Sequence, residues 1–184
     1  MDEKDRKILL FIARESIKSA ITDAPSEQAQ IEVISPDLKE KSGAFVTLRT
    51  HGKLRGCIGR MVSDISLYKL VSEMAVSAAK EDPRFCQLRP SDLEDLKIDI
   101  SALSPLQKID NPLDFKLGRH GIYIKKGSSN GCFLPQVATE TGWTKEEFLT
   151  QCCSMKAELS PDAWKNKNVD IYIFTSEIIS EKDQ

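Results

Sequence analysis

Apolar residues recur at three- and four-residue steps in three stretches of the chain. This spacing places them on one face of a helix and predicts three amphipathic helices. The helices are expected over residues 5–22, 66–80 and 145–155. The third has the clearest start, because Thr144 and Glu147 have the spacing of a capping box. A short fourth helix is expected over residues 90–96, where Ser91 and Glu94 repeat that spacing.

Alternating apolar and polar residues, bounded by turn-forming residues, predict two hairpins and two further strands. Tight turns join only antiparallel neighbours. The pattern therefore predicts an α+β protein with a mostly antiparallel sheet flanked by helices. The strands are expected over residues 44–48 and 54–59 for the first hairpin, 121–125 and 132–134 for the second, and 97–104 and 169–175 beyond them.

Composition narrows the classes of function. Apolar residues make up 40% and charged residues 29% of the 184-residue chain, which is typical of a compact domain with a core of its own. The 26 basic and 28 acidic residues leave a net charge of −2, so the overall positive charge that drives non-specific nucleic-acid binding is missing. Binding to nucleic acid is therefore not expected.

The N-terminus and the cysteines indicate the compartment. Residues 1–7 are charged with both signs, unlike a signal peptide, and no stretch approaches the ~20 apolar residues that span a bilayer. We expect a cytoplasmic protein without membrane contact. The cysteines contain no Cys-x-x-Cys pair, so neither disulfides nor a metal site is expected, and no cofactor is indicated. The five are Cys57, Cys86, Cys132, Cys152 and Cys153.

Residues 54–59 read Leu-Arg-Gly-Cys-Ile-Gly and follow a predicted strand and turn. This motif resembles the signature of the family named after the AMME syndrome chromosomal region, also called AmmeMemoRadiSam system protein A. The resemblance covers residues 45–174, with departures at Cys132-Phe133 and Glu158. Further matches, in the family's order, are Asp82-Pro83-Arg84-Phe85, His120-Gly121, Leu134-Pro135-Gln136-Val137, Glu147-Phe148-Leu149, Cys153 and Lys156-Ala157.

The resemblance implies one family domain over residues 1–184. It implies a larger α/β part and a smaller β-rich part around residues 118–140, with a cleft between them near the signature cysteine. It implies no established activity, so whether the chain is an enzyme stays open at this point, and an activity argued from the fold alone would be an association.

Cys57 and His120 are the candidate catalytic residues. Arg55 lies beside Cys57 in the sequence, and a nearby guanidinium favours the reactive thiolate. The alternative is that Cys57 is a small buried hydrophobe in a strand whose glycines allow close packing. A cysteine–histidine mechanism would need His51 or His120, and His120 matches a family position. Its alternative role is a hydrogen bond to the backbone.

Four further residues are candidate ligand-binding groups, and each has a structural alternative. The guanidinium of Arg84 could bind a carboxylate or phosphate, or it could form a salt bridge with Asp82. Lys156 lies near the C-terminus of a predicted helix, where its charge could instead complement the helix dipole. Gln136 follows Leu134-Pro135 and could instead start a helical turn. The four are Arg55, Arg84, Gln136 and Lys156.

Two hypotheses of function follow. In the first, the protein binds or modifies a small molecule in a cleft at Cys57, with thiol chemistry if there is any chemistry. In the second, it is a non-enzymatic regulatory or scaffold module that binds a protein or nucleic acid, or forms a homo-oligomer. A concave pocket that holds Cys57 with two or more of the polar groups would favour the first, and a flat apolar or basic patch elsewhere would favour the second.

Overall fold

The computed structural model describes residues 1–25 and 34–181. The chain divides into two compact units. Unit 1 consists of Met1–Leu103 with Glu177–Gln184, and unit 2 is Ser104–Ser176. Unit 2 is thus a longer segment than the β-rich part expected around residues 118–140.

Unit 1 is built on a four-stranded sheet with the order β2-β1-β3-β8, so β2 is an edge strand. The central strand β1 pairs antiparallel with both β2 and β3. The predicted first hairpin is confirmed, with the turn at His51 and Gly52, which both have positive φ. The strands are β1 (Ala44–Thr50), β2 (Lys53–Arg60), β3 (Leu96–Leu103) and β8 (Ser176–Ser180).

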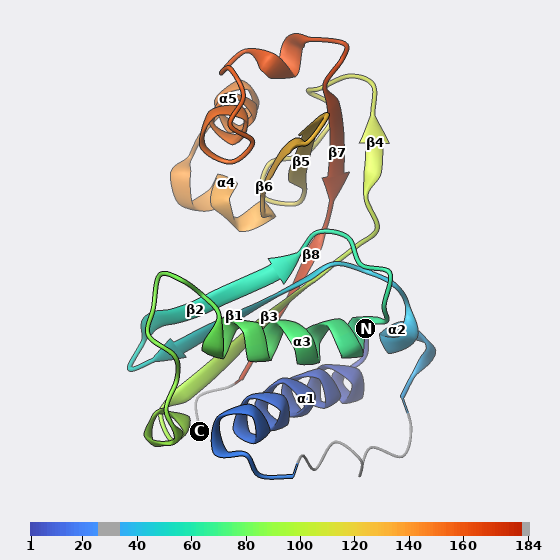
Figure 1. Ribbon diagram of the computed structural model, residues 1–184. Helices are drawn as coiled ribbons and strands as arrows, with labels where there is room; N and C mark the ends of the chain where they lie inside the picture. The colour runs from blue at the N-terminus through green and yellow to red at the C-terminus, as the bar shows by residue number, and fades with distance from the viewer. Residues whose placement is uncertain (26–33, 182–184) are drawn as a thin grey trace. The chain divides into compact units, whose positions relative to one another are not determined.

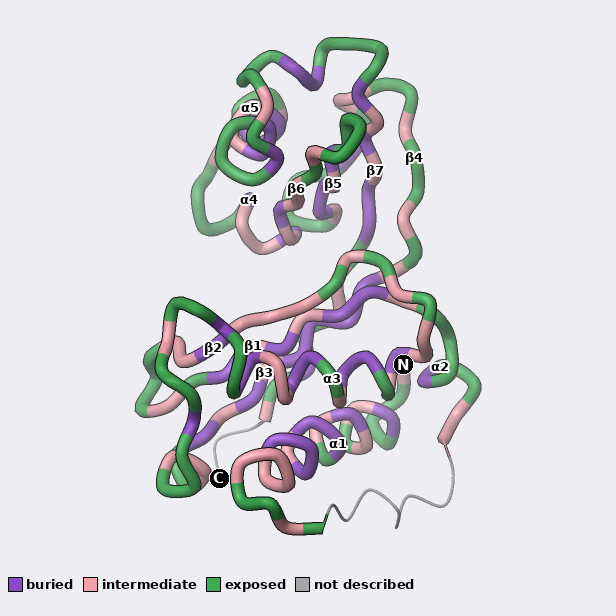
Figure 2. The backbone as a smooth tube through the Cα atoms, in the orientation of Figure 1, coloured by how far each residue is buried: buried purple, intermediate pink, exposed green. Residues whose placement is uncertain are grey.

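Two helices cover one face of this sheet (Figure 1). The α3 helix (Leu67–Lys80) packs against β1 and β2, and α1 (Glu3–Thr22) packs against α3. Both were predicted, and both present their buried residues toward the sheet or each other (Figure 2). Two short elements complete the unit, α2 (Pro36–Lys39) and the 3₁₀ turn η2 (Pro90–Leu93).

Unit 2 has its own antiparallel sheet, with the order β4-β7-β5-β6. The predicted second hairpin is β5–β6, and its turn at Gly127 and Ser128 is shorter than expected. β6 is one of the two edge strands of this sheet. The strands are β4 (Gln107–Ile109), β5 (Gly121–Lys126), β6 (Ser129–Phe133) and β7 (Asp170–Phe174).

Two helices pack on the sheet of unit 2, and a 3₁₀ turn packs against the second of them. They are α4 (Pro135–Thr141), α5 (Lys145–Met155) and η3 (Ala163–Lys165). α5 has the predicted bounds, and its capping box is formed by Thr144 and Glu147. The core gathers around Phe148, whose ring lies 5.3 Å from that of Phe133, centroid to centroid. The chain is therefore an α+β protein with two antiparallel sheets flanked by helices.

Several short elements differ from the prediction, and α2 and η3 are among those that had no predicted counterpart. The helix expected over residues 90–96 is only the 3₁₀ turn η2, because β3 already begins at Leu96. Its capping carboxylate is that of Asp92, which accepts the backbone N–H of Arg89, and not that of Glu94. The patterns gave no signal for β4 and β8. Among the helices of the described residues, none has the length and hydropathy to cross a bilayer.

Candidate functional site

The signature motif lies on β2, and the pairing with β1 contains a β-bulge. Leu48 lies opposite Gly56, but the next residue, Arg49, lies opposite Leu54. Arg55 is therefore the extra residue of the bulge, which bends the strand and turns its side chain out of the regular alternation.

Arg55 fastens the segment after α3 to the edge strand. Its Nη1 donates to the carbonyl of Cys86 at 2.7 Å, and its Nη2 to that of Gln87 at 3.4 Å. Asp92 provides a carboxylate 3.7 Å from Nη2. The guanidinium is thus engaged by backbone carbonyls and an acid, which is a structural use of this residue.

The two glycines of the motif lie where a side chain does not fit. A Cβ on Gly56 would overlap the carbonyl of Ala78 in α3, and a Cβ on Gly59 would overlap the ring of Phe45 and the carbonyl of Ala44. Gly56 therefore allows helix α3 to approach the sheet closely. The motif thus has a packing role beside any chemical one.

The Asp82-Pro83-Arg84 segment clamps the main chain of Cys57. The Cys57 N–H donates to Oδ2 of Asp82 at 2.8 Å, and the Cys57 carbonyl accepts from Nη2 of Arg84 at 3.2 Å. Arg84 also donates to both oxygens of Asp82, from Nε at 2.9 Å and from Nη2 at 2.7 Å. The clamp satisfies the N–H and the carbonyl of Cys57 at the edge of β2, which would otherwise be open for pairing with another strand.

The electrostatics of this clamp are asymmetric. The Asp82 side chain is 3% exposed and that of Arg84 is 56% exposed. Hydrogen bonds from Arg84 hold the pKa of the Asp82 carboxyl well below its usual range, although burial opposes this. The same hydrogen bonds raise the pKa of Arg84, with a smaller contribution from Cys57. A buried anion therefore fixes a cation that reaches solvent.

The thiol of Cys57 lies between this cation and a hydroxyl. Cys57 is half-buried, and the Thr47 hydroxyl donates to its Sγ at 3.2 Å. The guanidinium hydrogen-bonded to Cys57 is that of Arg84, whereas Arg55 bonds to Cys86 and Gln87. Nη1 of Arg84 donates no hydrogen bond to a carbonyl or carboxylate of the described residues.

The other three candidate residues belong to unit 2. Nδ1 of His120 accepts the backbone N–H of Lys116 at 3.3 Å, and burial, followed by Arg119 and Lys116, lowers the pKa of the imidazole. Gln136 lies in the first turn of α4, and Lys156 caps the C-terminus of α5 with its amine 5.9 Å from the centroid of the Phe133 ring. The structure thus groups Cys57 with Arg84, and it keeps His120, Gln136 and Lys156 in the second unit. The catalytic pairing of Cys57 and His120, and the cleft, stay predictions.

Three pockets of the described residues have volumes of about 450, 660 and 430 Å³. None of these three is lined by any of the six candidate residues. Within residues 1–25 and 34–181, no cluster of three or more His, Cys, Asp or Glu side chains is arranged to hold a metal ion. The candidate site at Cys57 consists of a half-buried thiol, a hydroxyl and an exposed guanidinium.

The salt bridge between Arg84 and Asp82, one of the roles expected for Arg84, is present. Two contacts were not predicted: the Cys57 N–H donates to Asp82, and Thr47 lies against the Cys57 sulfur. The first contact joins positions 25 residues apart and carries no local signal. The second follows from the register of β1 and β2, which the hairpin length alone does not fix.

Comparisons of this chain with a family model, with related sequences and with a solved structure agree with one another. The family model AMMECR1 matches residues 10–179. A protein of Thermococcus onnurineus is 38% identical over 96% of this chain and 90% of its own length. One of Methanopyrus kandleri is 42% identical over 79% of this chain and 74% of its own. The crystal structure of an uncharacterised protein of Pyrococcus horikoshii superposes with a TM-score of 0.85 at 33% identity, covering 99% of this chain and 93% of that one.

Proposed function

Since the chain belongs to the AMMECR1 family, we propose its function from the site itself: it binds a small anionic molecule at Cys57 and Arg84. The names of the relatives given above state no activity. The observation that carries this proposal is the exposed guanidinium of Arg84, held in place by a buried carboxylate. A guanidinium fixed in this way loses little conformational freedom when an anion binds. A carboxylate is the fitting class of ligand group, because Nη1 offers it an unused donor.

The thiol gives this site a second functional group. Cys57 and Arg84 share a hydrogen bond through the Cys57 carbonyl. An anion on Arg84 would therefore lie close to the Cys57 sulfur, and binding and thiol chemistry can be tested separately. The five cysteines form no disulfide among the described residues, which supports our proposal that the protein functions in the reducing cytoplasm.

The experiment is a binding screen of small carboxylates against three variants, read by ligand-observed NMR. We expect ligands of the wild type to be lost in Arg84→Gln and retained by Arg60→Gln. Arg60 is the matched control, because it lies on the same strand and pairs with Glu73 at 3.2 Å. Cys57→Ser should keep binding, because the carboxylate pairs with Arg84 and not with the thiol. Carboxylates that bind Arg84→Gln as well as the wild type would contradict the proposal.

One observation favours the second hypothesis, a module that binds a protein partner. Phe11 of α1 is 38% exposed and lines a pocket with Ile8, Lys4 and Lys7. Exposed aromatic residues are enriched in surfaces that contact another protein. If this surface joins two copies of the chain, Phe11→Ser should lower the sedimentation coefficient at high concentration. An unchanged coefficient would remove self-association from this hypothesis.

A further inference from the structure

The pocket of unit 2 lies apart from every candidate residue named so far. Its volume is about 430 Å³, within the range of small-molecule sites. Its apolar lining comes from β4, β7 and the segments next to them. These residues are Ile109, Pro112, Trp164, Val169 and Ile171.

Three lysines line this pocket, and two of them are neutralised. Lys108 pairs with Asp170 at 2.6 Å, and Lys165 pairs with Asp162 at 2.6 Å. Lys167 forms no ion pair with a residue of the part of the chain that the structure describes. It is therefore the cation of the pocket whose charge is available to a ligand.

The backbone that carries Lys167 is held at both ends. Before it, Trp164 is buried, and its Nε1 donates to Oγ1 of Thr150 at 3.0 Å. After it, the N–H of Val169 donates to the carbonyl of Asn166 at 3.1 Å, which closes a turn with Lys167 inside it. The turn therefore presents Lys167 from a fixed support, although the lysine side chain itself is exposed.

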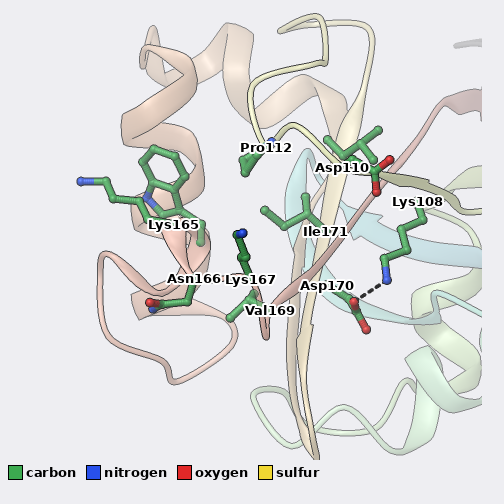
Figure 3. A pocket seen from close by; sticks show the side chains of 11 residues that line it. Lys108, Asp110, Pro112, Lys165, Asn166, Lys167, Val169, Asp170 and Ile171 are labelled. Atoms are coloured by element: carbon green, nitrogen blue, oxygen red, sulfur yellow. Dashed lines mark ion pairs between the residues drawn. The ribbon is translucent and has the colours of Figure 1, made fainter.

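The side chains of the three lysines also point in different directions. Figure 3 shows Lys167 extending toward the space between Pro112 and Ile171, while the amine of Lys165 points away from the other labelled side chains. Lys108 is joined to Asp170 in the same view, and Asp110 lies on that side of the pocket. Asp110 is also among the acids that raise the pKa of Lys108. The pocket thus has a cationic end at Lys167 and, at the other end, Asp110 beside the neutral Lys108–Asp170 pair.

We propose that this pocket binds a small monoanion with an apolar body, such as an aryl or branched-chain carboxylate. The carboxylate pairs with Lys167, and the apolar body covers Val169 and Ile171. Asp110 lies at the other end, where Asp170 is already paired with Lys108, and its charge disfavours a dianion such as a phosphate ester, because like charges in one small pocket repel each other. This site is independent of the proposed function at Cys57 and Arg84.

The test uses three probes of one shape: phenylacetate, its neutral analogue phenylacetamide, and the dianion phenyl phosphate. Binding is read from the methyl NMR signals of Val169 and Ile171. We expect phenylacetate to shift these signals with a Kd on the order of 1 mM, typical of a ligand of this size, and the other two probes to bind at least about fivefold more weakly.

Variants make the assignment specific. Lys167→Gln should weaken phenylacetate about tenfold, since it removes one charge-assisted hydrogen bond. Lys165→Gln is the matched control and should change the affinity less than about twofold, because Lys165 is paired and points away. Asp110→Asn should improve phenyl phosphate relative to phenylacetate. Equal losses in both lysine variants, equal binding of the acetamide, or shifts elsewhere than Val169 and Ile171 would each overturn the proposal.

Discussion

The two sheets end in edge strands that share a local sequence and differ in chemistry. β2 carries Gly56-Cys57, and β6 carries Gly131-Cys132. In both strands a Cβ on the glycine would overlap the chain of another segment: the carbonyl of Ala78 in helix α3 in unit 1, and the turn at Lys156 and Ala157 that follows α5 in unit 2. The glycine thus has the same role twice, which is to let the edge strand lie close to neighbouring backbone.

The cysteines that follow have different surroundings. Cys57 is bracketed by Asp82 and Arg84 through its main chain, and Thr47 contacts its sulfur. Burial raises the pKa of the Cys132 thiol, and Lys156 only partly opposes this. The Gly-Cys pair therefore serves packing in both strands. A carboxylate and a guanidinium that are distant in the sequence make only Cys57 a candidate for thiol chemistry.

The largest expected effect comes from breaking the clamp at Asp82. Asp82→Asn should lower the free energy of unfolding by about 3 kcal/mol, because the Cys57 N–H and Arg84 lose a buried charged acceptor; the exposure of Arg84 places the value at the low end for a buried pair. Urea unfolding measures it. The half-buried Asp92 is the control, and Asp92→Asn should cost less than about 1 kcal/mol. Equal losses in the two variants would show that the clamp contributes nothing special to β2.

The shared role of the glycines is tested next. Gly56→Ala and Gly131→Ala should each lower the free energy of unfolding by about 2 kcal/mol, since the new methyl group meets backbone that cannot rotate away. Lys53→Ala on the exposed part of β2 is the control and should stay within about 0.5 kcal/mol. If only one of the glycine variants is destabilised in thermal and urea melts, the parallel between the two edge strands is wrong.

Local patterns predicted most of this fold and little of the clamp. Both hairpins and three of the four predicted helices are present, because periodicity, caps and turn residues are encoded by neighbouring positions. The strands β4 and β8 were not predicted because neither has a run of alternating apolar and polar residues, and each gains its order from pairing. The contact between Asp82 and Cys57 depends on where the chain returns after α3. Such long-range geometry has no period that a single sequence displays.

The pH dependence of stability follows from Asp82. Its pKa is lower in the folded protein than the unfolded value of about 3.9, because Arg84 donates hydrogen bonds to the carboxylate. The stabilisation is therefore complete above about pH 5 and is lost as the pH falls below about 4 toward the folded pKa. We expect Asp82 to contribute a slope of up to about 1.4 kcal/mol per pH unit in that range. Urea midpoints at about pH 6, 4 and 3 should fall less steeply in Asp82→Asn, and parallel curves for both proteins would refute the assignment.

The smallest expected effect concerns the two thiols directly, and it decides whether the signature is a chemical or only a packing motif. We expect Cys57 to react with iodoacetamide at about pH 7 faster than the other four cysteines, and above all faster than Cys132, whose thiolate is disfavoured by burial. Timed alkylation and peptide mapping report all five together.

Two arginine variants separate the effect of the clamp from general surface charge. Arg84→Gln should slow alkylation of Cys57 by about threefold, because it removes the cation hydrogen-bonded at that residue, whereas Arg60→Gln on the same strand should leave the rate unchanged. Cys86 is exposed and bonded only through its carbonyl to Arg55, so its rate measures accessibility without the clamp. If Cys57 is labelled only after denaturation, its sulfur is a packed hydrophobe. In that case Cys57→Ala should cost about 1 kcal/mol of stability and leave carboxylate binding at Arg84 intact.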